Sequence, residues 1–461
     1  MLQITHNINK LKGNSSPKQT YLLVRFISDA QGPKNLQISF SGKRLTHFGG
    51  VYLLYCFFKK IQLKPKLGKE LSFSQRNNRF TISEELLSLI YPIILGLGHI
   101  ETSHLLRHNG VFQYLTGLPT YPNLTTLRRF LLRMAPLALP KLRALHDKLL
   151  SMMSGKPEKP TAVIFDLDST MLKLYGKQEL ARVGYNPLKP GRVSYHPLLC
   201  FNGLTKDYWH GELRSGDTHT STGAIQLLQA SFAKLPESVI KTIKVRADKG
   251  FFDHEIIEAI EDKAQFIIVA KATKPIKRKL QSLRYQKHSS GAESSEFYYQ
   301  PHRWSKRYRF IAIRRPLPEE QTQQLSLFTL GRYSYQVFVT NMKLTPLNCW
   351  KFYNQRAAVE LIIKELKHDY PLAKIPTKYF QANEAYFHIL LFAYNLLNWF
   401  KRLCLPKEYH PLTLSTLRYR LLLIPGEFVR SGNRPILKLP ANFYYKEAFQ
   451  HALKSIKILK L

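Results

Sequence analysis

Acidic residues at three places in the sequence could bind metal ions and cut phosphodiester bonds. The segment VIFDLDST sets Asp166 and Asp168 at the end of a buried-strand pattern, and IKVRADKG sets Asp248 at the end of another. An aspartate there points into the crevice where open α/β sheets bind ligands, although the position also suits a turn or cap. With Glu360 these residues form a carboxylate set that suits Mg²⁺. Two such ions can activate water or a 3′-hydroxyl for in-line displacement at a phosphate.

Glu360 lies in a helical pattern, 349–370, that also carries cations. On a helical projection Glu360 shares an arc of about 80° with a phenol and three cations, which are Tyr353, Arg356, Lys364 and Lys367. The rest of the circumference is apolar, which predicts a helix buried on most sides with one narrow polar stripe. The stripe is either a solvent-exposed face with a Glu360–Lys364 ion pair, or a carboxylate aimed into a cleft with cations that hold phosphate oxygens.

The elements that must position these residues alternate between strand and helix patterns. In chain order they are a strand at 161–168, two strands around a turn at 195–214, a helix at 221–235, a strand at 239–248, a helix at 253–264 and a strand at 265–271. This order predicts a mixed α/β sheet. A polar, basic and aromatic stretch with strand-like alternation follows at 274–324, and a strand at 335–341 leads into the helix of Glu360.

The region before the sheet has the pattern of short helices joined by turns. The last of them begins after Pro122, with Asn123 as the expected N-cap. Its exposed face would carry two threonines and two arginines, Thr125, Thr126, Arg128 and Arg129. This composition suits the recognition helix of a helix-turn-helix near 102–134, and it also suits a plain bundle with a basic solvated face. At the other end, the tail from Lys401 has 12 basic and 3 acidic residues and is expected to be helical and surface-lying.

Composition narrows the class of partner. The chain of 461 residues has 69 Lys and Arg against 31 Asp and Glu, a net charge of +38. Such a body attracts polyanions, and nucleic acid is favoured over an anionic membrane. A hydrophobic fraction of 44% excludes global disorder. The four scattered cysteines predict neither a zinc site nor a disulfide framework. The apolar stretches at 86–100 and 386–400 are shorter than the roughly 20 residues of a membrane span.

The carboxylate motifs resemble those of a known family, the DDE transposases of bacterial insertion sequences. Within it, the chain is similar to the IS-four-type superfamily, which is marked by a Tyr-x2-Arg-x3-Glu-x6-Lys signature. That signature is met without a departure in spacing by Tyr353, Arg356, Glu360 and Lys367. The segments 166–199 and 380–400 are also similar to one subgroup with Asp-x-Asp-Ser-Thr and Gly-Tyr-Asn-Pro motifs. The likeness covers about 159–401.

The resemblance implies an RNase H-like catalytic core and assigns roles to residues. Asp168, Asp248 and Glu360 would be the catalytic and metal-binding residues, with Mg²⁺, which Mn²⁺ could replace, as the cofactor, in two ions. Asp166 would be a supporting partner behind them. The phosphates at the transposon end would be held by the signature phenol and cations together with the nearby lysine, which are Tyr353, Arg356, Lys364 and Lys367. In the β-rich insertion, Trp304 would stack on a DNA base, although it could equally pack the insertion itself.

The resemblance also implies a domain plan and partners. A mainly helical DNA-binding region at 1–155 would precede the catalytic domain at 156–402, with its insertion at about 273–332, and a basic region at 403–461 would follow. The expected partners are double-stranded DNA, as terminal inverted repeats and as target, and further copies of the chain in a dimer or higher assembly. The expected reaction is strand cleavage and strand transfer of cut-and-paste type, in the bacterial cytoplasm and at the nucleoid.

Two other interpretations remain open on the sequence. VIFDLDST also fits the Asp-x-Asp-x-Thr motif of haloacid-dehalogenase-type phosphohydrolases, in which Asp166 would be the nucleophile and Asp168 the general acid and base. That interpretation leaves the stripe of Glu360 and the charge of +38 without a use. The second alternative is a DNA-binding transposase derivative that has lost catalysis, although all three carboxylates are present.

Overall fold

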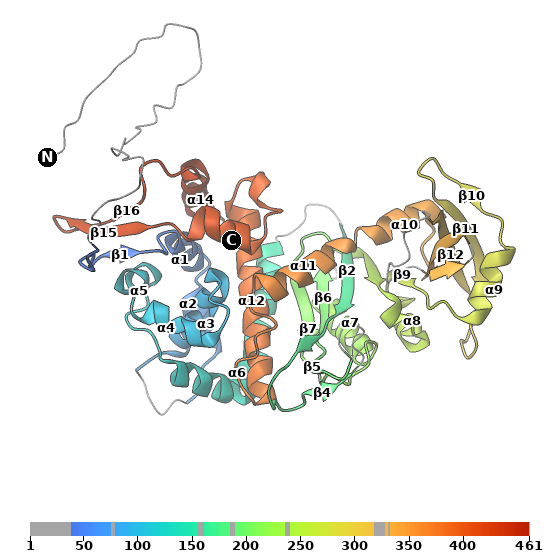
Figure 1. Cartoon of the computed structure of the whole chain (residues 1–461), viewed down its shortest axis with the longest axis horizontal. Coiled ribbons are helices and arrows are strands. Elements are labelled where there is room, and N and C mark those ends of the chain that lie inside the picture. Colours follow the sequence, from blue (N-terminus) through green and yellow to red (C-terminus); the bar gives the residue numbers. More distant parts are fainter. Residues whose placement is uncertain are drawn as a thin grey trace, which may run out of the picture.

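A computed structural model describes residues 38–74, 79–154, 161–184, 190–235, 240–317, 328–330 and 332–460. The chain forms an elongated body with helices of the N-terminal region at one end and β-strands of the insertion at the other (Figure 1). Parts of several predicted features lie outside the described residues. These parts are the first 37 residues of the predicted helical region, 318–327 and 331 of the predicted insertion, and Tyr185, Asn186 and Pro187 of the Gly-Tyr-Asn-Pro motif.

The centre of the molecule is a mixed sheet whose strand order is β7-β6-β2-β8-β9. Its strands are β2 (Thr161–Ser169), β6 (Leu198–Asn202), β7 (Tyr208–Glu212), β8 (Ile240–Ala247) and β9 (Gln265–Val269). Strand β2 pairs antiparallel with β6 and parallel with β8, and β8 pairs parallel with β9. With α7 (Ala224–Phe232) and α8 (His254–Ile260) between the strands, this is the strand and helix order of an RNase H-like core, as predicted.

The insertion continues the same sheet. Strand β14 (Tyr333–Thr340), the strand predicted at 335–341, pairs antiparallel with β9, and the insertion strands β12 (Tyr308–Pro316), β11 (Glu293–Tyr299) and β10 (Gln286–Lys287) follow in order. A short strand, β13 (Phe328–Leu330), pairs with β14, and α9 (Lys274–Ser282) begins the insertion. The predicted β-rich insertion is therefore confirmed, and it extends the catalytic sheet at its β9 edge.

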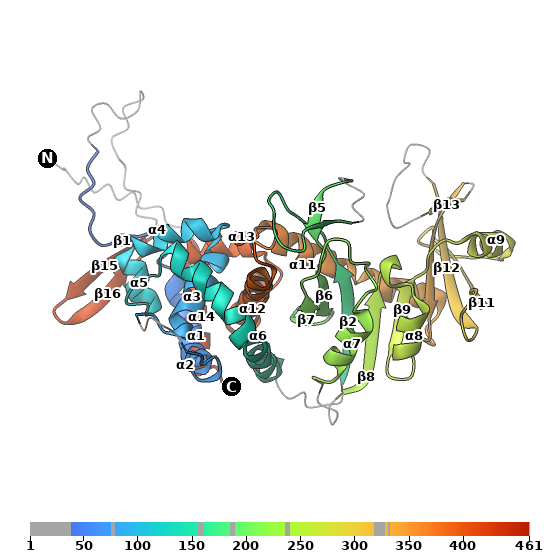
Figure 2. The same cartoon turned by 90° about the horizontal axis from the view of Figure 1, so that it is seen from below.

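Helices cover both faces of the central strands (Figure 2). Helices α7 and α8 contact each other on one face, where α7 packs on β6 and β7. On the other, α11 (Ala357–His368) packs on β2, while α12 (Phe380–Cys404) contacts β7 at the edge of the sheet. Every residue of β6 is buried, as expected for a strand that is covered on both faces. The mixed sheet is therefore held as the middle layer of three.

The helix predicted over 349–370 is two helices. Helix α10 (Pro346–Asn354) ends and α11 begins with a break at Gln355 and Arg356. The backbone N–H of Arg356 bonds to the Tyr353 carbonyl at 2.8 Å, which closes a tighter turn. The carbonyl of Phe352 accepts a hydrogen bond from the Arg246 side chain at 2.8 Å. The prediction of one continuous helix was wrong, because a side chain from β8 takes a carbonyl that the helix would have used.

The N-terminal helices are α1 (Val51–Lys60), α2 (Leu63–Glu70), α3 (Ile82–Leu95), α4 (His104–Arg107), α5 (Gly110–Thr116) and α6 (Leu124–Ser154). The Asn123 cap is confirmed, since its Oδ1 accepts the backbone N–H of Thr126 at 2.8 Å. The pattern predicted that this helix is short and ends with the helix-turn-helix near 134. Instead α6 continues through Pro136 and Pro140, because buried residues such as Leu142 and Leu149 pack it on α12.

The C-terminal tail folds back onto the N-terminal helices. It contains α13 (Leu414–Leu417), a hairpin of β15 (Gly426–Ser431) and β16 (Arg434–Lys438), and α14 (Lys446–Ile458). Strand β15 pairs with β1 (Leu45–Thr46), and α14 contacts α1 and α12 with Phe449 and Ile456 buried. The expectation of a helical, surface-lying tail was incomplete, because the tail includes a hairpin and buries one face of its last helix.

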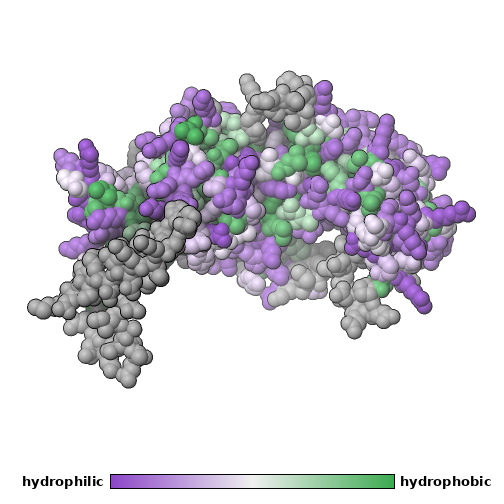
Figure 3. Space-filling view, turned by 90° about the horizontal axis from the view of Figure 1, so that it is seen from above, coloured by the Kyte–Doolittle hydropathy of each residue, from purple (hydrophilic) through white to green (hydrophobic). Residues whose placement is uncertain are grey.

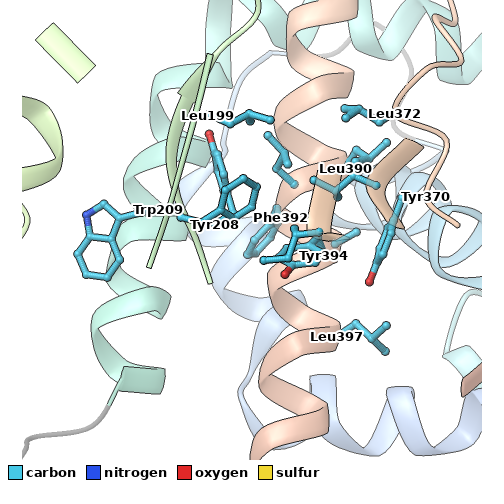
Figure 4. Close-up of a cluster of buried hydrophobic side chains, with 14 of the residues drawn as sticks. Leu199, Tyr208, Trp209, Tyr370, Leu372, Leu390, Phe392, Tyr394 and Leu397 are labelled. Carbon is cyan, nitrogen blue, oxygen red and sulfur yellow. The ribbon is translucent and has the colours of Figure 1, made fainter. Parts of the chain in front are cut away.

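Helix α12 joins the helical region to the sheet. Its apolar side chains Leu390, Phe392 and Leu397 lie in one cluster with Leu199 and Tyr208 of the sheet (Figure 4). Polar residues on α12 bond to the edge strand instead. Asn395 accepts the Tyr208 N–H at 2.8 Å and donates to the Tyr208 carbonyl at 2.7 Å, as a neighbouring strand would. Within the described ranges no single helix is long and apolar enough to cross a membrane, and only the bent pair Ile82–Leu95 and Ile100–Arg107 approaches that length and composition.

Three buried histidines, His146, His210 and His388, lie together where α6, β7 and α12 meet. Burial is the largest cause that lowers the pKa of each, and that of His210 falls to about 3, with Lys234 and Arg143 adding to the effect. A histidine that is neutral when folded takes up a proton on unfolding below its ordinary pKa of about 6.5. The unfolded state then binds more protons, so stability rises with pH in this window.

We therefore expect these histidines to make the thermal unfolding temperature fall as the pH is lowered from about 6.5 toward pH 3. Differential scanning fluorimetry across this range measures the slope. Replacing His210 with Gln should make the slope shallower, because one buried titrating group is removed. Replacing the exposed His451 of α14 with Gln is the control and should leave the slope as it is. Equal slopes in all three proteins would contradict the assignment.

Candidate active site

Asp168 and Asp248 lie at the same edge of the sheet. Strands β2 and β8 are parallel and pair Asp166 with Arg246, so both strands reach this edge two residues later. Asp168 accepts the backbone N–H of Ser169 at 2.8 Å, and Asp248 accepts that of Gly250 at 2.9 Å. These short-range bonds fix each carboxylate at the carboxyl end of its strand, as the sequence predicted.

Glu360 faces this edge from α11, and Arg356 lies between the carboxylates. The Arg356 Nη2 is 3.3 Å from Asp168 Oδ2, and its Nη1 is 3.5 Å from Glu360 Oε1. Nη2 also donates to the Leu167 carbonyl at 2.8 Å. Arg356 is 3% exposed, whereas the Glu360 side chain is 68% exposed. The guanidinium therefore connects a buried acid of the sheet to an open acid of the helix.

The negative charges of the carboxylates act on the pKa values of Asp168 and Tyr353. The pKa of Asp168 is raised to about 6, chiefly by burial and also by the charges of Asp248 and Glu360, against the opposing charge of Arg356. The pKa of Tyr353 is likewise raised to about 12, chiefly by burial and also by the same three carboxylates, while the charge of Arg356 opposes the shift. Crowded negative charge of this kind favours a bound cation.

The residue types at the site suit divalent metal ions, but their side chains are not arranged around an ion position. Carboxylate oxygens from Asp168, Asp248 and Glu360 are the hard donors that Mg²⁺ and Mn²⁺ prefer. Across the part of the chain that the structure describes, no group of three or more His, Cys, Asp or Glu residues is already set to hold an ion. The cation present among the carboxylates is Arg356, so binding of an ion would require its side chain and that of Glu360 to shift.

The exposed polar stripe predicted on this helix is wrong for two of its members. Tyr353 is 9% exposed and packs its ring 4.8 Å from that of Phe338, and Arg356 is buried. Lys364 is exposed and Lys367 is half-buried. Burial lowers the pKa of Lys367, and the nearby charge of Asp168 opposes that shift. The two lysines are therefore more exposed than Tyr353 and Arg356, and the predicted phosphate contacts of all four stay predictions.

Asp166 belongs to a buried ion pair that the sequence did not reveal. Arg246 donates from Nε to Oδ1 at 2.6 Å and from Nη2 to Oδ2 at 2.7 Å, with both side chains at most 1% exposed. The guanidinium also lies 4.9 Å from the centre of the Phe352 ring. The pair thus fastens β2 to β8 and to the end of α10. A signal existed, because Asp166 and Arg246 each stand two residues before a site aspartate and so share a sheet face.

Further polar groups, also missed from the sequence, form a wall beside Asp168. His196 bonds through Nδ1 to the Thr218 carbonyl at 2.8 Å and through Nε2 to Ser169 Oγ at 3.1 Å. Because a carbonyl only accepts, Nδ1 carries the proton and Ser169 donates to Nε2. Arg214 donates to the His196 carbonyl at 2.9 Å and holds this wall in place.

The other predicted DNA-binding residues lie in the insertion and on α6. Trp304 is partly buried and packs on Phe252 and, at 5.4 Å between ring centres, on His254, in the segment that follows Asp248. This packing explains Trp304 without DNA, and base stacking stays a prediction. On α6, Arg129 is exposed, whereas Arg128 is ion-paired with Glu101. Figure 3 shows hydrophilic residues over most of the face seen there, with hydrophobic ones in small groups.

Comparisons with known proteins give a family and a distant fold neighbour. The model of the family described as Transposase DDE domain group 1 matches residues 29–461. Among curated proteins, no sequence matches the chain. A piggyBac transposase, solved as a synaptic complex with hairpin DNA, is similar in structure with 12% identity over 83% of this chain and 82% of that chain, at a TM-score of 0.47.

Proposed function

The chain belongs to the Transposase DDE domain group 1 family, and from this membership we propose that it is a DNA transposase that cuts and rejoins strands at Asp168, Asp248 and Glu360. The observation that carries the assignment is the arrangement of these residues: Asp168 and Asp248 stand at two strand ends on one sheet edge, and Glu360 lies on a helix that Arg356 connects to Asp168. The sequence signature Tyr353, Arg356, Glu360 and Lys367 supports placing the chain in the IS-four-type superfamily.

The proposed chemistry is hydrolysis at the transposon end, followed by attack of the freed 3′-hydroxyl on target DNA. Mg²⁺ bound by the three carboxylates would lower the pKa of the attacking oxygen and neutralise charge on the leaving one. Lys364 and Lys367 would hold phosphate oxygens beside the carboxylates. Ser169, held by His196, would line the opposite wall, and the Asp166–Arg246 pair would keep β2 and β8 in register.

The proposal extends to DNA and to assembly. With a net charge of +38, phosphate contacts would supply most of the affinity. The N-terminal helices, with Arg128 and Arg129 on α6, and the basic tail would bind the terminal inverted repeats, and Trp304 would stack on a base near Asp248. Because two ends must be processed together, a dimer or higher assembly on paired ends is expected.

The structure argues against the phosphohydrolase interpretation, because its expected nucleophile, Asp166, is not accessible. Asp166 is 0% exposed, and both its oxygens are bound by Arg246. A carboxylate in that position cannot reach a phosphate ester. Family membership points the same way. An inactive derivative remains as one outcome of the cleavage test.

The test is cleavage of DNA that carries the ends of the element, which are short inverted repeats expected in the DNA flanking the gene. The purified chain should release 3′-hydroxyl ends in Mg²⁺ or Mn²⁺. Removing the ions with EDTA should abolish cleavage while leaving DNA binding in place, because the basic surface does not depend on them. Cleavage that continues at full rate in EDTA, or none in either metal, would contradict the proposal.

A further inference from the structure

A groove lies where the two chain segments that leave the carboxylate site meet α6. One segment, 174–181, follows β2 and the short strand β3 (Leu172–Lys173), and the other, 374–379, follows α11. The groove is open, has a volume of about 360 Å³, and is lined by Arg128, Leu132, Lys177, Gln178 and 375–379. We call it the α6 groove. Its walls are thus direct continuations of the elements that carry Asp168 and Glu360.

The walls of the α6 groove are fastened to each other. The backbone N–H of Glu179 bonds to the Lys378 carbonyl at 2.8 Å, and the Glu179 carboxylate accepts the Phe380 N–H at 2.8 Å. Asn383, which is 1% exposed, bonds to the backbone N–H and carbonyl of Thr377 at 3.1 and 3.0 Å. Because these bonds already order both segments, a ligand that binds there loses less free energy to the ordering of loops.

The groups that face the α6 groove suit a nucleotide. Lys177 and Lys378 are exposed cations, and the ring of Tyr379 is partly exposed with the Lys378 ammonium 5.0 Å from its centre. The Gln178 side chain is partly exposed, lines the same groove and offers amide donors and acceptors to a base edge. Two acids lie nearby. Glu101 is ion-paired with Arg128, and the Glu179 carboxylate accepts the backbone N–H of Phe380.

The volume of the α6 groove favours an unpaired DNA strand over a duplex as its ligand. Its volume of about 360 Å³ lies in the range of about 300–1,000 Å³ for small-ligand sites. One or two nucleotides fit such a space, whereas a duplex does not. We propose that the α6 groove binds an unpaired DNA strand beside the cleaved phosphodiester, with phosphates on Lys177 and Lys378 and a base against Tyr379 and Gln178. The inference rests on the proposed function, since it takes DNA as the substrate.

Binding of two fluorescent probes to the full chain tests the α6 groove. One is a duplex with a single-stranded 3′ overhang of mixed sequence, and the other is the same duplex with blunt ends, both in EDTA. The Lys177→Ala, Lys378→Ala double variant should bind the overhang probe about tenfold more weakly, and its salt slope should be shallower by about 1.4, for two single-strand contacts. Its affinity for the blunt probe should match that of the control.

The control is the Lys241→Ala, Lys263→Ala double variant. It removes the same charge at the amino ends of β8 and β9, opposite the end that carries Asp248. Tyr379→Ala should cut the preference for a normal over an abasic overhang by about 5- to 150-fold, the effect of one stacked base. If both double variants weaken both probes equally, or wild type does not prefer the overhang, the groove assignment is overturned.

Binding in EDTA separates this inference from the proposed function. A chain that binds the overhang through the α6 groove but never cuts DNA would overturn the proposed function and support the groove. A chain that cuts end DNA but keeps its overhang preference in the Lys177→Ala, Lys378→Ala variant would overturn the groove alone.

Discussion

We expect the Asp168→Asn, Asp248→Asn and Glu360→Gln proteins each to cleave end DNA more slowly than wild type, by about 10²- to 10³-fold or more. Each substitution keeps the shape of the side chain and removes the negative charge that would hold a metal ion. Single-turnover cleavage in Mg²⁺ at saturating protein measures the chemical step without the binding step.

DNA affinity supplies the internal control for these variants. Removing an acid from a basic protein should not weaken DNA binding, so an intact Kd with lost cleavage places the effect in catalysis. The exposed Asp262, which follows α8, gives the matched Asp262→Asn variant, which should cleave like wild type. Three site variants that all cleave like Asp262→Asn would show that these carboxylates are not the active site.

The second large effect concerns stability. We expect Arg246→Ala and Asp166→Ala each to lower the free energy of unfolding by about 3–5 kcal/mol, because each leaves a buried charge without its partner. Urea unfolding followed by circular dichroism measures the change. Gly203→Ala should disturb the same ion pair, because the added Cβ would lie only 2.6 Å from Arg246 Nη2 and 2.8 Å from Asp166 Oδ2.

An exposed ion pair calibrates this experiment. Arg182 and Asp217 are 3.7 Å apart with side chains 61% and 51% exposed. Arg182→Ala should therefore change stability by less than about 1 kcal/mol. If Arg246→Ala costs no more than Arg182→Ala, the buried pair does not hold the strands and the break before α11 as described.

The sheet and its two aspartates could be predicted because their signals are local. Buried-strand patterns ending in Asp168 and Asp248 give both the strands and their ends, and parallel pairing then brings the ends together. The three-strand, helix, strand, helix, strand order was readable for the same reason. The roles of Asp168, Asp248 and Glu360 stay predictions until the variants are measured.

The features that sequence reasoning missed depend on contacts between distant parts of the chain. The helix of Glu360 breaks because Arg246, 106 residues earlier, binds the Phe352 carbonyl. A helical projection assumes an unbroken helix, so it placed the buried Tyr353 and Arg356 on one exposed stripe with Glu360 and Lys364. In the same way, α6 outlasts two prolines because α12 packs along it, and the tail forms a hairpin that pairs with β1.

The most direct test of the central claim is a change of metal preference in cleavage by the Asp168→Cys protein. A thiolate is a softer ligand than a carboxylate, and Mn²⁺ accepts it more readily than Mg²⁺ does. If Asp168 binds the catalytic ion, the variant should be inactive with Mg²⁺ and should recover cleavage with Mn²⁺, while wild type cuts with both. An Asp168→Cys protein that cleaves end DNA equally well with Mg²⁺ and Mn²⁺ would contradict the account, because its side chain would then not touch the metal.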